Sequence, residues 1–442
     1  MGHGGSRNRK VQAACAAVLA AGLALAGCAP EEEILEGERF DVRPGAAALT
    51  KPQPQGFVMP RMQTLADWSH PTFSGGRSPA HLALAAAPQE AWRAQIGEGN
   101  GRRHRITADP VIAGGTIFTL DSRALVVATS QSGERLWSAD LTPPGESAND
   151  ASGGGLAASG GRLYVTTAFG SLTALDAATG QRIWQQALGA PAVGAPVVEG
   201  DLVYVSTRDS QGWAIETGTG RVRWQLSAAP SPAGRIGSAG PVVAGRLVLF
   251  PFASGEISAL LRKSGLRVWN GYAVGGRDVA AYSAISDITG APVIASGAAI
   301  VGNPAGRTVA LDLTDGSQRW AAPFGAMSRV WVAGDSVFLL SDTNQLVRLD
   351  LRSGRLIWAA DLPFFEKTRA KRRRDVFAHF GPILAGGSLL VASDDGLIRR
   401  FDPQTGAERD SIEIPAGAAS NPIVVGETLY IVTGDGTLRA FR

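Results

Sequence analysis

The histidines and cysteines are the side chains of this sequence with the most obvious capacity for chemistry. There are five His and two Cys residues, and none stands at metal-ligand spacing from another. The sequence contains no HExxH or CxxC motif, no nucleophile elbow built on a serine and no glycine-rich phosphate loop, because its glycines fall between expected strands and not before helices. We therefore expect no metal, no bound cofactor and no catalytic residue.

Cys28 is the exception, because the residues before it predict a covalent modification. A basic start and an apolar segment at about residues 11–27 are typical of a secretory signal, and the segment is too short to span a bilayer comfortably. It ends in Leu-Ala-Gly followed by Cys28, which resembles the bacterial lipobox, in which the Cys is lipidated and becomes the new first residue. Ala29 in place of Asp suggests transport onward to the outer membrane. We expect residues 1–27 to be a lipoprotein signal peptide and Cys28 to carry the lipid, at the periplasmic face; an ordinary signal peptide is the alternative.

Processing at this position would change the charge balance. Residues 1–27 hold three of the 42 basic side chains and none of the 39 acidic ones, so 39 of each kind remain. A neutral chain lacks the excess of Lys and Arg that nucleic-acid binding needs. Cys28 would be the one thiol left, so no internal disulfide is expected.

Residues 28–90 are rich in Pro, Gly and acidic residues and show no periodicity. This composition predicts a flexible tether and N-terminal extension rather than a packed domain. The later part, from Trp68 to His81, interleaves turn residues with aromatic ones, and we expect it to pack on the outside of the domain that follows.

From residue 91 to residue 442, one short phrase recurs about every 45 residues. Its fullest form, residues 175–184, is Leu-Asp-Ala-Ala-Thr-Gly-Gln-Arg-Ile-Trp. The Asp can accept backbone N–H groups of a turn, the Gly supplies a positive φ, and the Trp can pack against the next repeat. A Trp follows a Gly by four residues at Gly133/Trp137, Gly180/Trp184, Gly220/Trp224, Gly265/Trp269, Gly316/Trp320 and Gly354/Trp358, while Asp410 takes that place after Gly406. This period is the length expected of four-stranded propeller blades, and it makes the repeated Asp residues structural rather than catalytic.

The two ends of the repeat region have complementary defects. Seven complete four-strand units are followed by an eighth that begins near Asn421 and stops after its third strand, at Arg442. A lone strand at Ala91–Ile96 has no earlier partners. We therefore predict an all-β, eight-bladed propeller of four-stranded antiparallel blades, closed by an N-terminal strand that completes the C-terminal blade. Seven blades with Trp92 outside the ring is the alternative.

A basic run occupies residues 367–374, between the sixth and seventh units, with six Lys or Arg residues among its eight. A solvated loop is one interpretation. The other is an electrostatic contact with an acidic partner or with phosphorylated lipid headgroups.

The lipobox Cys28, the tether and the Leu-Asp-x-x-Thr-Gly-x-x-x-Trp repeats together resemble the BamB family, lipoproteins of the outer-membrane β-barrel assembly (BAM) machine of Gram-negative bacteria. The resemblance covers about residues 25–442. It implies a non-enzymatic scaffold that binds the POTRA region of BamA through loops on one edge of neighbouring blades and assists the folding and insertion of outer-membrane proteins. It also implies a monomer within a hetero-complex, with nascent outer-membrane proteins as further partners.

Family members use a Leu-Arg pair and an Asp-x-Asp pair for this contact. Asp287 matches the first carboxylate of the second pair, whereas Thr289 replaces the other. Arg235 and Ile236 stand at the place of the first pair, with the basic and apolar members reversed. The resemblance thus implies Arg235, Ile236 and Asp287 as partner-binding residues; ordinary loops leading into strands are the alternative.

The same repeats occur in dehydrogenases that use pyrroloquinoline quinone, so they specify architecture more strongly than function. Such enzymes are usually longer, hold the quinone in the central well of the propeller, bind Ca²⁺ and carry an adjacent Cys pair. Here the Cys pair is missing, and no Glu/Asn/Asp calcium set stands out. A quinoprotein dehydrogenase and a propeller lipoprotein that serves another envelope complex remain the alternative functions.

Overall fold

The computed structural model describes residues 51–72, 74–150, 152–231, 239–275, 286–367, 369–372 and 374–442. These residues belong to one compact unit, Gly45–Arg442. Within these ranges, short 3-10 turns occur at η1 (Ser74–Gly76) and η3 (Ala370–Arg372), and the other regular elements are β-strands. Within the described ranges, no helix has the length and apolar character needed to cross a membrane.

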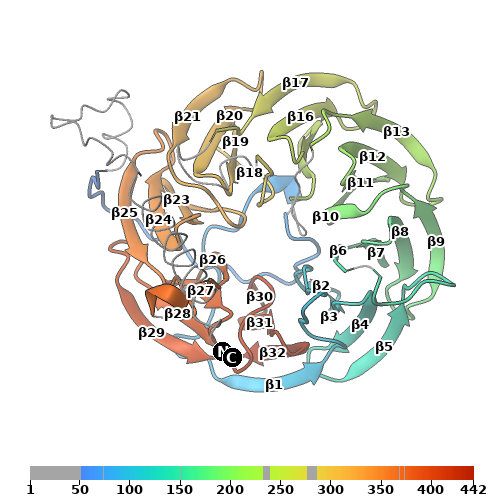
Figure 1. The fold of residues 1–442 in the computed structure, drawn as a ribbon, viewed down its shortest axis with the longest axis horizontal. Coiled ribbons are helices and arrows are strands. Elements are labelled where there is room, and N and C mark those ends of the chain that lie inside the picture. Colours follow the sequence, from blue (N-terminus) through green and yellow to red (C-terminus); the bar gives the residue numbers. More distant parts are fainter. Residues whose placement is uncertain are drawn as a thin grey trace, which may run out of the picture. The chain divides into compact units, whose positions relative to one another are not determined.

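Eight four-stranded antiparallel sheets follow one another round a ring in the described ranges (Figure 1). In blades 1 to 7 the strands pair in chain order, from the innermost to the outermost. Blade 1 consists of β2 (Val111–Ala113), β3 (Thr116–Leu120), β4 (Leu125–Ser130) and β5 (Arg135–Asp140), and blade 2 of β6 (Gly154–Ser159), β7 (Arg162–Thr167), β8 (Ser171–Asp176) and β9 (Arg182–Ala187). Blade 3 consists of β10 (Ala192–Glu199), β11 (Leu202–Thr207), β12 (Gln211–Glu216) and β13 (Val222–Ser227), and blade 4 of β14 (Val242–Ala244), β15 (Leu247–Pro251), β16 (Glu256–Leu261) and β17 (Arg267–Tyr272). Blade 5 consists of β18 (Val293–Ala295), β19 (Ala298–Asn303), β20 (Arg307–Asp312) and β21 (Gln318–Ala322). Blade 6 consists of β22 (Trp331–Ala333), β23 (Ser336–Leu340), β24 (Gln345–Asp350) and β25 (Leu356–Asp361), and blade 7 of β26 (His379–Ala385), β27 (Ser388–Ser393), β28 (Leu397–Phe401) and β29 (Glu408–Glu413).

Blade 8 joins the two ends of the repeat region. Its sheet has the order β1-β32-β31-β30, with β1 (Glu90–Gln95) outermost and β30 (Ile423–Val425), β31 (Thr428–Val432) and β32 (Thr437–Phe441) inside it. Trp92 pairs with Ala440 and Gln95 with Thr437 in an antiparallel register. The predicted eight blades and their closure by the N-terminal strand are confirmed.

Burial separates the strands of each blade. All six residues of β11 are buried, whereas β9, an outermost strand, alternates between exposed and partly buried residues. Sheets stacked round a ring cover both faces of their inner strands, so these strands read as continuous apolar runs, while the outermost strands keep a solvent side. The core is therefore divided among the spaces between neighbouring blades.

The repeated Trp residues hold these spaces closed, as the sequence predicts. At each of seven junctions, the indole lies over the turn glycine of the following blade. A Cβ added to Gly354 would come within 2.5 Å of the Trp320 ring, and one added to Gly180 within 2.5 Å of the Trp137 ring. The indole N–H also donates to a carbonyl of the same turn, as Trp320 does to Leu351 at 3.0 Å. Glycine is thus required twice, because its φ is +70° at Gly354 and its missing side chain makes room for the ring.

Residues 51–89, predicted as part of a flexible extension, pack against the ring in the structure. Trp68 exchanges two backbone hydrogen bonds with Ile112 of β2 at 2.8 and 2.9 Å, and Leu82 N donates to the Leu384 carbonyl of β26 at 2.9 Å. In Figure 1 this segment begins beside β25 on the outer side of blade 6, passes inside the circle of innermost strands and ends at β1. Its later part thus lies beside the innermost strands and not on the outside of the ring, where it was expected. It binds through backbone groups of strand edges and through the buried side chains of Trp68, Leu82 and Leu84, whose spacing is not periodic.

Candidate partner-binding rim

On one face of the ring, the outermost strand of each blade is followed by a loop that leads to the next blade. In seven of the eight blades, all but blade 5, the backbone N–H of the first residue after this strand donates to a carbonyl in the turn between the second and third strands of the same blade. In each of these pairs, the first residue donates its backbone N–H to the backbone carbonyl of the second: Ile96–Gly436, Leu141–Ala124, Leu188–Gly170, Ala228–Ser210, Ala273–Gly255, Leu362–Asn344 and Ile414–Gly396. Each accepting residue has a positive φ. We call the loops 96–110, 141–153, 188–191, 228–241, 273–292, 323–330, 362–378 and 414–422 the loop rim.

The two loops on either side of blade 4 carry the residues expected to bind a partner. Arg235 and Ile236 lie outside the described residues. The described ends of the two loops meet, because Ala239 N donates to the Ile288 carbonyl at 3.0 Å. Both of these residues are buried in one apolar cluster between blades 4 and 5. The structure therefore brings the described parts of the two predicted segments together.

Asp287 lies in the described part of the second loop and is buried, with 1% of its surface exposed. Its neighbours are held in place as well: Ile288 is equally buried, and the Thr289 hydroxyl donates to the Ala326 carbonyl of the next rim loop. The resemblance implies Asp287 as a partner-binding residue, and in this structure its side chain is buried. In this conformation, any effect of Asp287 on a partner would pass through the shape of its loop.

The outermost strand of blade 4 presents apolar side chains that sequence reasoning missed. Leu266, Val268, Tyr272 and Val274 are 65, 43, 53 and 43% exposed. They lie on and beside β17, whose pairing in the described residues is with β16 alone. The strand leads directly into the loop that holds Asp287. We call these four residues the blade 4 patch; exposed apolar groups gathered in one place mark interaction sites.

Alignment of the repeats contains the signal that would have found this patch. Directly after the turn glycine, blade 4 has Leu266, whereas blades 1, 2, 3, 5, 6 and 7 have Glu134, Gln181, Arg221, Ser317, Arg355 and Ala407. Seven positions after that glycine, blade 4 has Tyr272, whereas the same blades have Asp140, Ala187, Ser227, Pro323, Asp361 and Glu413. Folding requires apolar residues at the buried positions of a repeat but not at these, so the large apolar side chains found there in blade 4 indicate a surface role.

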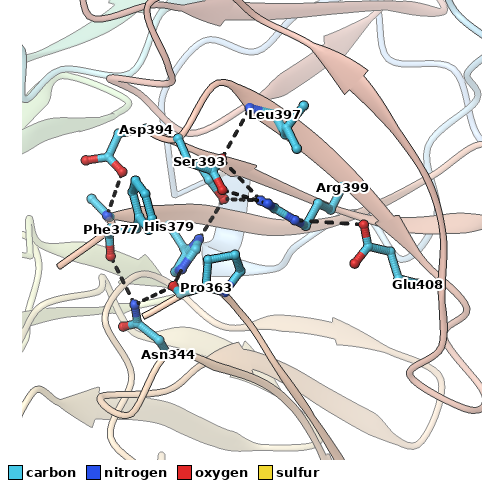
Figure 2. Close-up of polar contacts among 11 residues, drawn as sticks. Asn344, Pro363, Phe377, His379, Ser393, Asp394, Leu397, Arg399 and Glu408 are labelled. Atoms are coloured by element: carbon cyan, nitrogen blue, oxygen red, sulfur yellow. Dashed lines mark hydrogen bonds and ion pairs between the residues drawn. The ribbon is translucent and has the colours of Figure 1, made fainter. Parts of the chain in front are cut away.

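The rim loop between blades 6 and 7 carries the basic run. Its two ends are joined by Asn344, whose side-chain amide donates to the carbonyls of Pro363 and Phe377 at 3.1 Å each (Figure 2). The Nε2 atom of His379 lies 2.9 Å from the Pro363 carbonyl, and its Nδ1 atom lies 2.6 Å from the Ser393 hydroxyl. The base of this loop is thus attached to blade 6 and to blade 7.

The contact between Ser393 and His379 is structural. Burial lowers the pKa of His379, so the ring is neutral at neutral pH. Its Nε2–H then donates to the Pro363 carbonyl, and its Nδ1 accepts from Ser393, whose oxygen accepts from Arg399 at 3.3 Å (Figure 2). The Ser393 side chain has no exposed surface, so no substrate can reach it as a nucleophile.

The ends of the innermost strands, near which the alternative function would hold a quinone and Ca²⁺, contact the N-terminal segment and two linked rim loops. The N-terminal segment is hydrogen-bonded to the innermost strands β2 and β26, where the resemblance would place the cofactor. Asp109, whose pKa burial raises, accepts from the amide N–H groups of Asn421 at 2.8, 3.0 and 3.1 Å and so links two rim loops. Throughout the described ranges, no group of three or more His, Cys, Asp or Glu residues is placed to hold a metal ion.

A protein-family model described as "Outer membrane protein assembly factor BamB" matches residues 122–360 and 368–442. The chain is 25% identical over 363 residues to the outer membrane protein assembly factor BamB of Yersinia pestis, covering 80% of this chain and 89% of that one. It is 24% identical over 360 residues to the protein of the same name from Escherichia coli K12, and the match covers 79% of this chain and 88% of that one.

Solved structures show the same architecture. The crystal structure of BamB from Moraxella catarrhalis superposes with a TM-score of 0.67 at 18% identity, covering 80% of this chain and all of that one. The quinohemoprotein alcohol dehydrogenase of Comamonas testosteroni gives a TM-score of 0.65 at 15% identity, covering 85% of this chain and 80% of that one. At these identities, the two structures establish the fold alone. The family model spans most of the propeller, and by that match this chain belongs to the family of the outer membrane protein assembly factor BamB.

Proposed function

We propose that this chain is a non-enzymatic scaffold of the BAM complex that binds the POTRA region of BamA through the blade 4 patch and the two rim loops beside it. In this role it assists the folding and insertion of outer-membrane proteins and works as a monomer within the hetero-complex. Membership of the assembly-factor family supports this role. The observation that carries it is an exposed apolar patch next to the two loops that the resemblance implies in partner binding.

The patch has the physical character of a binding surface. Its four side chains are exposed on a strand that has one outward edge in the described residues. Burial of such side chains against a partner contributes roughly 1–2 kcal/mol each, at about 25 cal/mol per Å² of apolar surface. The bond between Ala239 and Ile288 holds the bases of the two loops together, which reduces the entropy lost on binding.

The first test removes the patch. Leu266→Ser combined with Tyr272→Ser should lower the affinity for the BamA POTRA region by about 2 kcal/mol or more, as expected for central apolar contacts. Leu136→Ser combined with Ile183→Ser is the matched control, because these residues are 51 and 44% exposed on the outermost strands of blades 1 and 2. Equal affinity of both double variants would place the interface elsewhere.

A second test concerns the residues implied by the resemblance. Arg235→Ala and Ile236→Ala should each weaken BamA binding by about 1 kcal/mol or more, as interface residues do. Asp287→Asn keeps the shape of the buried side chain and removes its charge, so we expect weaker binding together with a lower melting temperature. Unchanged affinity in all three variants would exclude this part of the proposal.

The proposed anchor is tested by Cys28→Ala. A lipid on Cys28 would place the wild-type chain in the outer-membrane fraction, and the variant should appear in the soluble periplasmic fraction. An unchanged distribution would show that Cys28 is not the anchor.

Affinity purification of the protein from membranes separates the alternatives. Capture of BamA, together with nascent outer-membrane proteins, supports the proposal. Capture of a different envelope complex would favour the other scaffold function. Turnover of an alcohol or sugar after addition of pyrroloquinoline quinone and Ca²⁺ would establish the dehydrogenase.

A further inference from the structure

The rim loop between blades 6 and 7 forms a hairpin. Phe377 N donates to the Phe364 carbonyl at 2.9 Å, and Glu366 N donates to the Asp375 carbonyl at 3.0 Å. Between these two bonds, Phe365 pairs with Val376 in an isolated antiparallel bridge. We call residues 364–377 the basic hairpin. The two sides of its stem stay paired up to Glu366 and Asp375, and the described residues beyond them, Lys367, 369–372 and Arg374, form its tip.

The tip concentrates positive charge that has no carboxylate partner within the described residues. Lys367, Arg369, Lys371, Arg372 and Arg374 are all exposed, and no ion pair of the described ranges includes any of them. The sequence adds a sixth basic residue, Arg373, while the only acidic residues of the hairpin are the two at the top of its stem. Like charges repel in a folded structure, so their concentration at one tip favours an anionic ligand.

Apolar side chains lie in the stem of the hairpin, next to its basic tip. Phe365 is 37% exposed and Val376 is 48% exposed, and the rings of Phe364 and Phe365 lie 4.6 Å apart. A basic edge beside a short apolar surface is the arrangement with which proteins bind the boundary between lipid headgroups and acyl chains. A contact based on charge alone, such as one with an acidic protein segment, would not need exposed aromatic and aliphatic groups at this place.

The base of the hairpin is held more firmly than the base of a simple linker. Asn344 of blade 6 bonds to both of its sides, and the Ala378 amide beyond it donates to Asp394 of blade 7 at 2.9 Å (Figure 2). A hairpin fixed to two blades keeps one orientation relative to the ring. It can therefore position the whole propeller on a surface, whereas a lipid on a long tether leaves the orientation free.

We propose that the basic hairpin docks on an anionic membrane surface, with its Lys and Arg side chains against lipid phosphates and with Phe365 and Val376 at the headgroup boundary. This interaction is separate from the contact with BamA, because it uses blades 6 and 7 instead of blade 4. It adds a second attachment to the membrane and turns the loop rim between those blades toward the lipid.

Binding to lipid vesicles tests the proposal. The full chain with Cys28→Ser, which cannot acquire a lipid at that position, serves as background for every variant. It should bind vesicles of phosphatidylethanolamine and phosphatidylglycerol at low ionic strength, and binding should weaken as salt is added, because the Debye length falls to about 10 Å at 0.1 M salt. The combined changes Lys371→Ser, Arg372→Ser and Arg374→Ser should weaken binding by about 100-fold, as expected for three basic residues at an anionic surface.

The rim provides a matched control. Arg102→Ser, Arg103→Ser and Arg105→Ser remove three exposed basic residues from the rim loop between blades 8 and 1, with the same change in net charge. We expect less than about a fivefold loss of vesicle binding for this control, which is the contribution of a single basic residue. An equal loss in both triple variants would show attraction by overall charge and would overturn the proposal, as would absence of vesicle binding at low salt.

Three further measurements identify the ligand. Phe365→Ala should weaken vesicle binding even at high salt, where charge attraction is screened; no change would remove the apolar part of the proposal. Polyglutamate that binds the hairpin more tightly than vesicles do would make an acidic protein the occupant and overturn the membrane assignment. Competition by free inorganic phosphate would indicate a discrete phosphate site and overturn it too. None of these results depends on BamA, so they leave the proposed scaffold function to its own tests.

Discussion

Seven of the eight junctions between blades differ from the one that closes the ring. At the seven, a Trp of the outermost strand lies over the turn glycine of the following blade, and its indole N–H bonds to a carbonyl of that turn. Between blades 7 and 8, the corresponding residue is Asp410. Blade 8 has no turn between its third strand, β32, and its fourth strand, β1. These two strands come from opposite ends of the repeat region. The Trp is thus absent where the turn that it would cover is absent.

Polar contacts replace the aromatic one at the closure. Asp410 pairs with Arg400, which lowers the pKa of the Asp410 carboxyl, and Arg400 also donates to the Ala86 carbonyl just before β1. Within blade 8, Arg439 is bonded to Glu90 at 2.9 Å across the two chain ends. The comparison indicates that hairpin junctions are held by apolar burial and the closure by backbone pairing and charge. It can be tested from both sides.

The largest expected effect is at a hairpin junction. Trp320 is 6% exposed and lies over Gly354. Trp320→Ala should reduce the free energy of unfolding by about 3–5 kcal/mol, because it removes a large buried side chain and leaves a cavity. Urea unfolding measures the loss, and hydrogen exchange should locate faster opening in blades 5 and 6. Trp320→Phe, which keeps most of the apolar area, is the control. A loss below 1 kcal/mol for Trp320→Ala would remove the basis of the comparison.

Acid should act on the segment that supplies the closing strand. His70 lies in that segment, 7% exposed, and burial together with the positive charge of Arg329 lowers its pKa from 6.5 to about 4. The unfolded chain therefore takes up the proton first. The contribution of His70 is complete above pH 6.5 and is lost as the pH falls toward 4, by about 3 kcal/mol in all. Unfolding at several pH values should show a weaker acid dependence in His70→Asn. Identical pH profiles for the two proteins would contradict this assignment.

The sequence predicted the ring because each blade repeats the same local requirement. A turn glycine and a Trp four residues later imply one hairpin and one junction. The missing fourth strand after Arg442 and the lone strand at Ala91–Ile96 imply where the ring is closed. These inferences need only neighbours in the chain, and the structure confirms them.

The candidate site could not be predicted to the same depth. Asp287 is buried two residues before Thr289, whose hydroxyl donates to the Ala326 carbonyl, a contact across 37 residues that no local pattern reveals. The path of residues 51–89 depends on backbone bonds to strand edges, which are not specific to sequence, and on a few apolar side chains without regular spacing. The blade 4 patch was visible in the repeat alignment, but only as large apolar side chains at positions that are small or polar in the other aligned blades. Cys28, Arg235 and Ile236 lie outside the described residues and remain predictions.

A smaller effect is expected from the ion pair within blade 8. The Arg439 side chain is 4% exposed, whereas that of Glu90 is 33% exposed. Glu90→Gln should therefore cost about 1–2 kcal/mol, less than a fully buried pair, because Arg439 keeps a hydrogen-bond partner without a charge. Glu408→Gln is the control, since its partner Arg399 retains Asp395 at 2.6 Å. Hydrogen exchange of β1 and β32 should rise in the first variant alone; equal exchange in both would mean that charge does not hold the closure.

The smallest effect should come from making the eighth junction resemble the others. Asp410→Trp restores the repeat phrase in blade 7, but the following blade offers no turn glycine beneath the ring, and the Arg400 pair is lost. Exposed pairs contribute about 0–1 kcal/mol, and Asp410 is 49% exposed, so the free energy of unfolding should change by less than about 1 kcal/mol. Denaturant unfolding alongside wild type measures this. A Trp ring stabilises a junction only where a surface covers it, and in the other junctions that surface is the turn. Stabilisation of 2 kcal/mol or more would therefore show that another surface can take the place of the turn. The absence of Trp at this position would then have another cause than the missing hairpin.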